Sequence, residues 1–293
     1  MVLLVGVGSV GANAQLGAFY SKPIENRTLS DRWELDSATR RGTFLLTPYK
    51  PLFITAGRWS SNPNEQPYSE NPVYTYPLKI DLGKYEAKYQ LSLKVKMLQG
   101  IFGGHGDLWV GYTQKSHWQI YNATYSRPFR ETNYEPELIL NFATNFPLLG
   151  LRTRMLGITF NHQSNGRALP LSRSWNRVML HAGFERGKWV VLLRPWWHIR
   201  DADDENPAIT SHVGRGDALV VYKAKRHVLS LLGSHSLRWG AENRGQLQLD
   251  WAFPVRGNLR GNLQLLTGYG ETLIDYNHNQ STIGLGVILV DWL

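Results

Sequence analysis

Three polar residues have the types and the spacing of a nucleophilic catalytic site. His162 and Ser164 lie two positions apart, and Asn176 follows them in the chain. On a β-strand, residues two apart stand on one face about 6.6 Å from each other, so imidazole and hydroxyl come within reach. A hairpin would place Asn176 opposite His162, where its amide oxygen could accept the imidazole N–H. The pattern predicts a Ser-His-Asn arrangement, although a His and a Ser at this spacing are common, so their surroundings must decide.

The composition limits the kinds of partner and of chemical site that the protein can have. The chain has 293 residues, a formal net charge of +9, 11 Trp, 14 Tyr and no cysteine. A basic chain favours an anionic partner, for which nucleic acid and a lipopolysaccharide or phospholipid surface are the two candidates. Without cysteine there is no disulfide, no thiolate zinc site and no Cys nucleophile, which fits an exported bacterial protein.

The first residues predict a targeting segment. Residues 1–14 form an apolar run that ends in the A-x-A pattern Ala12-Asn13-Ala14, so we expect a signal peptide, although the usual basic start is missing. A G-x-G-x-x-G run within it is no dinucleotide site, because no alternating strand and helix units follow. Residues 15–50 then form a polar N-terminal lead, and residues 51–293 form one further domain.

Apolar and polar residues alternate along the rest of the chain in about twelve segments, which is typical of β-strands with one apolar face. The segments are residues 51–59, 86–98, 108–122, 134–144, 151–163, 174–185, 188–199, 214–224, 226–236, 243–253, 258–270 and 281–292. A soluble β-sandwich would show the same alternation. However, the segments are close to the roughly 9 to 11 residues that cross a bilayer at a tilt, whereas strands of soluble proteins average about 5 to 6.

Aromatic residues gather near the segment ends, among them Trp175, Trp189, Trp196, Trp197 and Trp251. Outer-membrane barrels carry such aromatic girdles at both membrane interfaces. We therefore predict an all-β, membrane-spanning antiparallel barrel of about twelve strands in the bacterial outer membrane. Its interior is expected to be filled by polar side chains.

The alternation also predicts which way the catalytic candidates point. His162 and Ser164 share the parity of Leu156, Ile158 and Phe160, and Asn176 shares that of the apolar residues after it. All three polar groups would then face lipid, where an unpartnered polar side chain is costly. They could instead sit at the headgroup boundary, where polar residues are common. If they are catalytic, a lipid-facing nucleophile would have a lipid substrate.

Several motifs of the chain resemble the outer membrane phospholipase A family, calcium-dependent barrels that hydrolyse acyl esters of phospholipids. The motifs are Tyr112-Thr-Gln114-Lys-Ser116, Pro128-Phe-Arg-Glu-Thr-Asn-Tyr-Glu-Pro136, Asn161-His162-Gln-Ser164-Asn-Gly166-Arg167, Ser172-Arg-Ser-Trp-Asn-Arg177 and Tyr269-Gly-Glu-Thr-Leu-Ile-Asp-Tyr276. The resemblance covers most of the chain after residue 14 and implies a twelve-stranded barrel. If the first strand leaves the periplasm, the odd strands run outward, so the connection between the fifth and sixth segments lies on the cell exterior and the site faces the outer leaflet.

The resemblance implies a role for each member of the predicted site. Ser164 would be the nucleophile, His162 the general base and then acid, and Asn176 the residue that orients the imidazole. The backbone N–H of Gly166 and a bound Ca²⁺ would stabilise the oxyanion.

The implied calcium ligands are oxygen atoms, as Ca²⁺ prefers. They are the Ser172 hydroxyl, the Arg167 carbonyl and, across a dimer interface, the Ser126 carbonyl. Leu169 stands where some relatives have an acidic residue. With no carboxylate in this set, we expect a weak site that depends on the dimer.

Gln114 shares its parity with Leu108, Val110 and Tyr112, so its amide would lie among lipid-facing residues. The resemblance implies that it bonds its counterpart in a homodimer. A non-enzymatic outer-membrane barrel, either a narrow channel or a structural protein, is the alternative. Nucleic-acid binding would require a salt-sensitive complex, and we expect none. The run 270–276 has no role that the sequence reveals.

Overall fold

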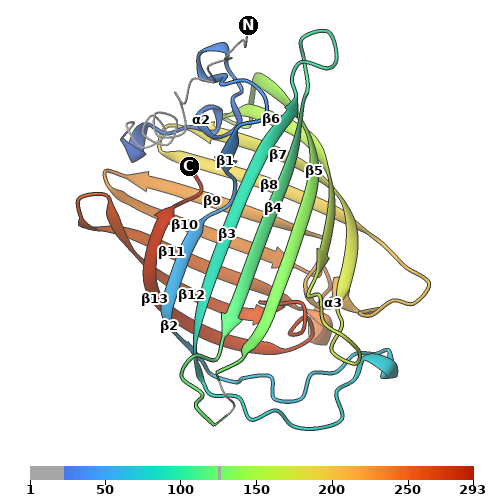
Figure 1. Cartoon of the computed structure of the whole chain (residues 1–293). Helices are drawn as coiled ribbons and strands as arrows, with labels where there is room; N and C mark the ends of the chain where they lie inside the picture. Colours follow the sequence, from blue (N-terminus) through green and yellow to red (C-terminus); the bar gives the residue numbers. More distant parts are fainter. Residues whose placement is uncertain (1–22, 125–126) are drawn as a thin grey trace, which may run out of the picture.

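Twelve antiparallel strands form a closed barrel in the residues that the computed structural model describes, 23–124 and 127–293 (Figure 1). Each strand pairs with its neighbours in the chain, and β2 pairs with β13 to close the wall. The strands are β2 (Leu52–Ser60), β3 (Tyr85–Leu98), β4 (Asp107–Trp118), β5 (Phe129–Leu148), β6 (Leu151–Ser164), β7 (Ser174–Arg186), β8 (Trp189–Ile199), β9 (Gly216–Ala224), β10 (His227–His235), β11 (Gly245–Arg256), β12 (Leu259–Tyr269) and β13 (Asn279–Val290). The predicted fold is confirmed.

Short elements accompany the wall. The strand β1 (Leu46–Pro48) pairs with β3, and the helices are α2 (Leu29–Trp33) and α3 (Ile209–His212). Single 3₁₀ turns are η1 (Ile24–Asn26), η2 (Ser37–Thr39), η3 (Pro72–Tyr74) and η4 (Gly240–Glu242). No helix in the described residues is long and apolar enough to cross a membrane.

The strand β5 is longer than the predicted segment 134–144. Its first residues include Glu131 and Asn133, which are 2% and 4% exposed and point into the barrel. Both share the inward parity of Glu135 and Glu137, but the outward position between them is Thr132, which is polar. The apolar face that defined the predicted segment therefore begins after the start of the strand.

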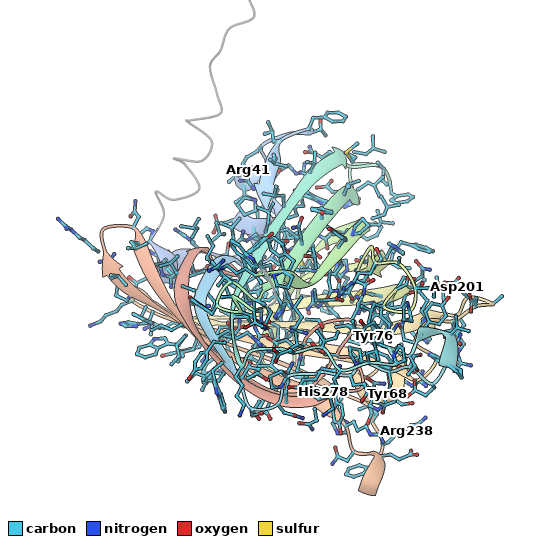
Figure 2. The ribbon with its side chains drawn as sticks, turned by 60° about the horizontal axis from the view of Figure 1, so that its bottom comes forward. Arg41, Tyr68, Tyr76, Asp201, Arg238 and His278 are labelled. Carbon is cyan, nitrogen blue, oxygen red and sulfur yellow. The ribbon has the colours of Figure 1, made fainter. Side chains whose placement is uncertain are left out.

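The barrel has two different ends. We call one the lead end, because it holds α2 and the C-terminal Leu293, and the other the loop end, because it holds the long connections 61–84, 165–173, 200–215, 236–244 and 270–278 (Figures 1 and 2). In Figure 2 the loop end comes forward, with Asp201 and His278 on its rim, and Arg41 lies at the lead end.

Apolar side chains fill the interior at the lead end. Leu29 and Trp33 of α2 belong to one buried cluster with Trp109, Ile139 and Met155 of the wall. Residues 23–50 of the predicted polar lead therefore contribute apolar side chains to the barrel core. The prediction of a polar interior is incomplete for this end, because the lead brings hydrophobic residues into it beside the buried ion pair of Lys96 and Glu34 at 2.9 Å.

Polar and aromatic side chains fill the loop end. Trp175 and Trp196 are 2% and 4% exposed and pack inside with Tyr276, so their predicted place in an outer girdle is wrong. Trp189 and Trp197 are 48% and 56% exposed, as expected for outward-facing residues. A tryptophan near a strand end can face either way, and only parity separates the two cases.

Candidate active site

His162 and Asn176 lie directly opposite each other on β6 and β7, as the hairpin predicts. The distance from His162 Nδ1 to Asn176 Oδ1 is 2.7 Å. Both residues are on the outer wall, where Leu156, Ile158 and Phe160 of the same face are 38%, 38% and 58% exposed. Because an amide oxygen only accepts, Nδ1 carries the proton and Nε2 is free to accept one.

Asp201, in the connection after β8, fixes the orientation of the Asn176 amide. Asn176 Nδ2 donates a hydrogen bond of 3.3 Å to Asp201 Oδ2. A carboxylate oxygen accepts and cannot donate, so the amide nitrogen must face Asp201 and the amide oxygen must face His162. The asparagine thus bridges the imidazole and a negative charge.

Ser164 is the last residue of β6 and shares the outer face with His162. It lies opposite Ser174 of β7 and Tyr134 of β5. In the described part of the chain its hydroxyl makes no hydrogen bond. Contacts between a nucleophile and its base are often loose in structures without substrate.

Gly166 has a left-handed backbone conformation, with φ of +63°. A Cβ atom at this position would also lie 3.1 Å from Cε2 of Tyr134. The turn that follows the serine therefore needs glycine for its backbone angle and for close approach to a neighbouring ring. The Gly166 N–H, which the resemblance implies as the oxyanion donor, belongs to this turn.

The same connection carries the predicted cation ligands Arg167 and Ser172. The Ser172 hydroxyl donates a hydrogen bond of 2.8 Å to Glu205 Oε1, so the structure brings a carboxylate to a set that was expected to have none. Leu169 is 59% exposed. Ser126 lies outside the described residues, and its predicted role is untested.

The connection and its neighbour Glu205 therefore offer hard oxygen donors, although the described residues contain no group of three or more His, Asp, Glu or Cys side chains that could hold a metal. A hydroxyl, a backbone carbonyl and one carboxylate are ligands of the kind that Ca²⁺ accepts and that softer metals do not prefer. The donor set of the connection fits calcium.

Gln114 lies on the outer face of β4, as predicted. Its Nε2 donates to Tyr89 Oη and Ser116 Oγ at 3.4 and 3.3 Å, and its Oε1 accepts from Tyr112 Oη at 3.3 Å. These hydrogen bonds are all long. The amide therefore keeps capacity for a further partner on the lipid-facing wall.

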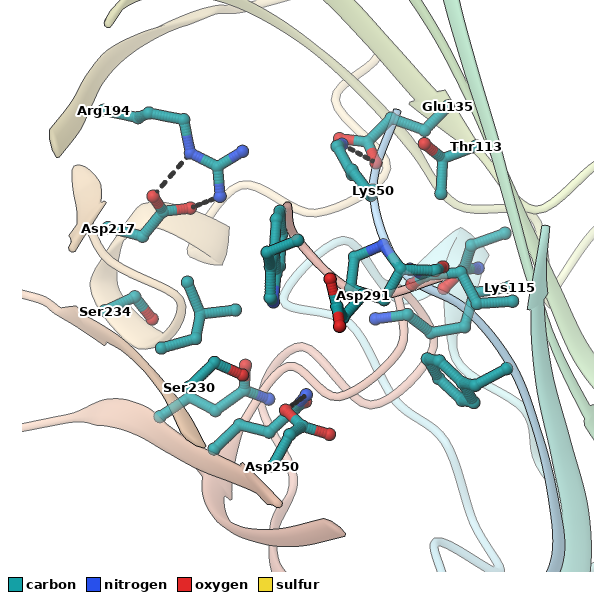
Figure 3. Close-up of a pocket in the computed structure, with 18 of the residues that line it drawn as sticks. Lys50, Thr113, Lys115, Glu135, Arg194, Asp217, Ser230, Ser234, Asp250 and Asp291 are labelled. Carbon is teal, nitrogen blue, oxygen red and sulfur yellow. Dashed lines mark hydrogen bonds and ion pairs between the residues drawn. The ribbon is translucent and has the colours of Figure 1, made fainter. Parts of the chain in front are cut away.

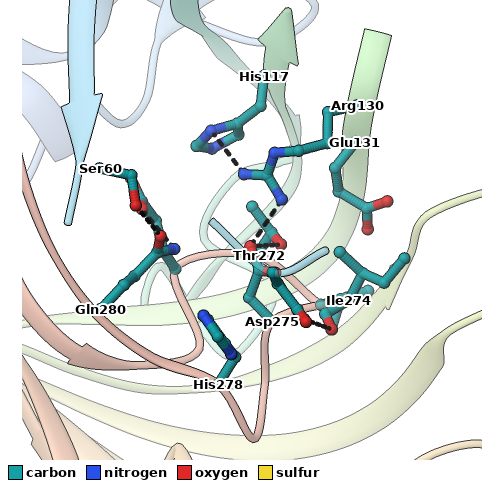
Figure 4. Close-up of polar contacts among 12 residues, drawn as sticks. Ser60, His117, Arg130, Glu131, Thr272, Ile274, Asp275, His278 and Gln280 are labelled. Atoms are coloured by element: carbon teal, nitrogen blue, oxygen red, sulfur yellow. Dashed lines mark hydrogen bonds and ion pairs between the residues drawn. The ribbon is translucent and has the colours of Figure 1, made fainter. Parts of the chain in front are cut away.

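Behind the site, the connection 270–278 folds into the barrel (Figure 4). Arg130 of β5 bridges Glu86 and Asp275, with Nε–Oε2 and Nη1–Oδ2 distances of 3.0 and 2.9 Å. Glu271 is paired with Arg58, and Lys88 Nζ lies 3.0 Å from Glu271 Oε1. The run 270–276, whose role the sequence did not reveal, is thus a buried segment held by ion pairs.

The environment shifts the carboxyl groups of this connection. Burial acts to raise the pKa of Glu271, but the charges of Arg58 and Lys88 outweigh it and hold the pKa well below its ordinary value. Burial also opposes ionisation of Asp275, while Arg130 and the Thr272 hydroxyl lower its pKa. Both groups are therefore charged at neutral pH.

The wall also encloses a cavity of about 170 Å³ (Figure 3). Opposite charges pair along it: Arg194 Nε lies 2.7 Å from Asp217 Oδ1, and Lys50 Nζ lies 2.8 Å from Glu135 Oε2. The charged groups that line this space are paired with one another and form a structural network.

Asp201 and Glu205 are the site neighbours that the sequence interpretation missed. Both belong to the acidic run Asp201-Ala-Asp-Asp-Glu205, between the seventh and eighth predicted segments. Such a run on the side of the barrel that carries the site was a usable signal. Its partners Asn176 and Ser172 could not be assigned without the structure of the loop.

The chain is similar to known proteins over most of its length. The family model described as Phospholipase A1 matches residues 29–289. The Phospholipase A1 of Klebsiella pneumoniae is 39% identical over 248 residues, which cover 85% of this chain and 83% of the relative.

Solved structures agree with the sequence relatives. The Salmonella typhi outer membrane phospholipase dimer with bound calcium has a TM-score of 0.77 and 38% identity, and the match covers 88% of this chain and 96% of that one. Escherichia coli outer membrane phospholipase A with an active-site asparagine replaced by alanine has a TM-score of 0.76 and 37% identity, covering 87% and 95%. With a matching family model, close relatives and the same outer-membrane barrel, this chain belongs to the phospholipase A1 family.

Proposed function

We propose that this phospholipase is calcium-dependent, acts as a homodimer and hydrolyses phospholipid acyl esters in the outer leaflet with Ser164, His162 and Asn176. The observation that carries the proposal is the 2.7 Å hydrogen bond between His162 Nδ1 and Asn176 Oδ1 on the lipid-facing wall. An active-site asparagine in the Escherichia coli relative supports the role of Asn176.

In the first half of the reaction, Ser164 Oγ attacks the ester carbonyl carbon while His162 Nε2 takes the hydroxyl proton. The C=O π electrons move to the carbonyl oxygen, and the Gly166 N–H would donate to this oxyanion. The C–O bond to the glycerol then breaks, and the imidazolium returns its proton to the leaving alkoxide. The products are an acyl-Ser164 ester and a lysophospholipid.

In the second half, water replaces the alcohol. His162 takes a proton from a water molecule as the water oxygen attacks the acyl carbon. The bond to Ser164 Oγ then breaks, and the imidazolium returns the proton to the serine. Asn176 holds the imidazole in one tautomer through both halves. Its neutral amide avoids an isolated charge on the lipid face, and Asp201 places a carboxylate one residue further away.

Bound calcium would supply positive charge beside the developing oxyanion. Within this chain the Arg167 carbonyl, the Ser172 hydroxyl and the neighbouring Glu205 carboxylate are the groups that would hold it. The Ser126 carbonyl of the second copy remains part of the proposal from the family resemblance. The calcium-bound dimer of the Salmonella typhi relative supports both features.

The proposed dimer uses the outer face around Gln114, whose amide has only long hydrogen bonds within its own chain. In lipid, an amide that finds a counterpart across an interface gains a hydrogen bond that lipid cannot offer. The net charge of +9 supports contact with anionic outer-leaflet lipid, including lipopolysaccharide. No nucleic acid partner is proposed.

Fatty acid release from phospholipid–detergent micelles tests the proposal. We expect calcium-dependent release by the wild type, loss with chelator, and loss of at least about 10³-fold in Ser164→Ala. Ser174→Ala is the matched control, because Ser174 lies opposite Ser164 on the same face, and it should retain activity. Equal release by the wild type and Ser164→Ala would refute the assignment of the nucleophile.

A further inference from the structure

The residue after the nucleophile points the opposite way from it. Ser164 lies on the outer face, whereas Asn165 is 4% exposed and faces the interior. Its backbone N–H donates to the Arg173 carbonyl at 2.9 Å, which closes the connection 165–173 at its base. Asn165 therefore stands between the lipid-facing site and the buried interior.

The Asn165 side chain uses its full hydrogen-bonding capacity. Its Oδ1 accepts from the backbone N–H groups of Arg173 and Arg167 at 2.9 and 3.3 Å. Its Nδ2 donates to the Leu171 carbonyl at 2.8 Å and to Glu131 Oε2 at 3.4 Å. An amide has two N–H donors and two acceptor lone pairs, so one side chain ties three backbone groups of the loop to a buried carboxylate.

This side chain holds the loop that carries three proposed functional groups: the Gly166 N–H, the Arg167 carbonyl and the Ser172 hydroxyl. Irregular backbone of this kind has few internal hydrogen bonds of its own, and a side chain that satisfies its N–H and C=O groups defines its shape. We propose that Asn165 is a positioning residue that fixes the oxyanion donor and the cation ligands relative to Ser164. The inference rests on the proposed function of those groups.

The support continues into the barrel. Asn133 Nδ2 donates to the other oxygen of Glu131 at 2.9 Å, and Asn133 Oδ1 accepts from the Leu273 N–H at 3.0 Å. Arg167 Nη1 also lies 3.8 Å from Glu131 Oε2. The buried segment 271–276 is thus connected through Asn133 and Glu131 to Asn165, which gives this segment a role in holding the site.

Asn165→Ala tests the role directly, because it removes all four side-chain hydrogen bonds without touching a reacting group. Asn262→Ala is the matched control: Asn262 is 1% exposed and its amide has no hydrogen-bond partner in the described residues. Asn165→Ser is a milder variant that keeps one hydroxyl. Folding of each variant is checked by the heat-dependent shift of the barrel on SDS gels.

Two readouts besides hydrolysis separate positioning from general damage. One is the Ca²⁺ concentration for half-maximal dimerisation, measured by sedimentation in detergent. The other is the rate at which an alkylsulfonyl fluoride labels Ser164. We expect folded Asn165→Ala to need at least about 10-fold more Ca²⁺ and to label on the order of 10²-fold more slowly, with Asn165→Ser between it and the wild type.

Wild-type values of both readouts in folded Asn165→Ala, or changes of equal size in Asn262→Ala, would overturn the inference. If Asn165→Ala does not fold, Asn165→Ser decides by the same criteria. Ser164→Ala in the hydrolysis assay separates a failure of the proposed nucleophile from a failure of the proposed positioning role. Full activity of that variant refutes the proposed nucleophile, whereas its inactivity together with unchanged Asn165 variants refutes only the positioning role.

Discussion

The outer and inner faces of β6 and β7 contrast within the same pair of strands. Outside, His162 and Asn176 share one exposed hydrogen bond. Inside, Arg177 donates to Asn161 Oδ1 at 2.6 and 3.0 Å, lies 3.1 Å from Glu135 Oε1 and stacks 3.9 Å from the centre of a Trp175 ring. Alternate residues of one strand thus belong to a sparse site and to a dense buried network.

The two faces are expected to control different properties: the outer face controls the rate of hydrolysis, and the interior controls the free energy of unfolding. A single hydrogen bond between neutral groups contributes about 0.5–1.5 kcal/mol, whereas a buried charge that loses its partner costs about 3–5 kcal/mol. Substitutions on the outer face should therefore lower activity and change the free energy of unfolding only slightly. Substitutions in the interior should do the reverse, unless the residue also supports the site loop, as we propose for Asn165.

The largest effect is expected for Glu271→Gln inside the barrel. Glu271 has a side chain 1% exposed and is paired with Arg58 and Lys88, which are equally enclosed. Removing its charge leaves two buried cations with one fewer partner, and we expect a loss of about 3–5 kcal/mol in the free energy of unfolding. Denaturant titration of the detergent-embedded barrel measures it.

Glu242→Gln is the control for this substitution. Glu242 pairs with Arg238 at 2.9 Å, but their side chains are 61% and 44% exposed. A surface pair of this kind should change the unfolding free energy by less than about 1 kcal/mol. Equal effects of the two substitutions would contradict the assignment of stability to the interior.

On the outer face, Asn176→Ala should lower kcat by about 10²-fold, which corresponds to roughly 2.7 kcal/mol. The reason is that His162 loses the acceptor that fixes its tautomer, while Ser164 and the oxyanion donor remain. The unfolding free energy should fall by no more than about 1.5 kcal/mol, because a single hydrogen bond between neutral groups is lost. A large loss of stability with normal kcat would contradict the division between faces.

Acid should destabilise the buried connection 270–278. Glu271 and Asp275 have pKa values held below their ordinary 4.5 and 3.8. A lowered pKa in the folded state stabilises the protein above the unfolded-state pKa, and this stabilisation is lost as pH falls through the folded-state pKa. We expect the unfolding free energy to be constant above about pH 5 and to fall below it. Each tenfold difference in proton affinity between the folded and unfolded states corresponds to about 1.4 kcal/mol of this loss.

The pH series has its own check. Glu271→Gln removes one of these two carboxyl groups. The unfolding free energy of the variant should therefore fall less steeply below pH 4.5 than that of the wild type. An identical slope in both proteins would mean that other carboxyl groups control the acid response.

The sequence predicted the wall and the outer face well, because a period of two is a strong local signal. Parity alone placed His162, Ser164 and Asn176 outward, and the hairpin placed Asn176 opposite His162. Both follow from strand geometry, which needs no knowledge of distant contacts.

The interior could not be predicted in this way. Trp33 reaches Trp109 from the lead, with ring centres 5.8 Å apart, and Asn133 meets Leu273 across the barrel. Such contacts join residues far apart in the sequence, and no local pattern specifies them. The same limit explains why the sequence interpretation missed Asp201 and Glu205 beside the site: both lie on a connection whose path the strand pattern leaves open.

The smallest effect is expected where the outer face depends on a loop. Asp201→Asn should lower kcat only about 3–10-fold, because its 3.3 Å hydrogen bond to Asn176 is exposed and acts through the amide rather than on His162 itself. Asp203→Asn is the matched control: Asp203 lies on the same connection but accepts from the Tyr74 hydroxyl at 2.7 Å, so kcat should not change.

A double-mutant cycle tests the path of this effect. If Asp201 acts by orienting the Asn176 amide, replacing it in an Asn176→Ala background should cost nothing further, because the group it orients is gone. Additive losses would mean that Asp201 influences His162 through space. In that case kcat would depend on the charge of the loop end as well as on the hydrogen bonds of the outer face. Activity could then no longer be assigned to the outer face alone.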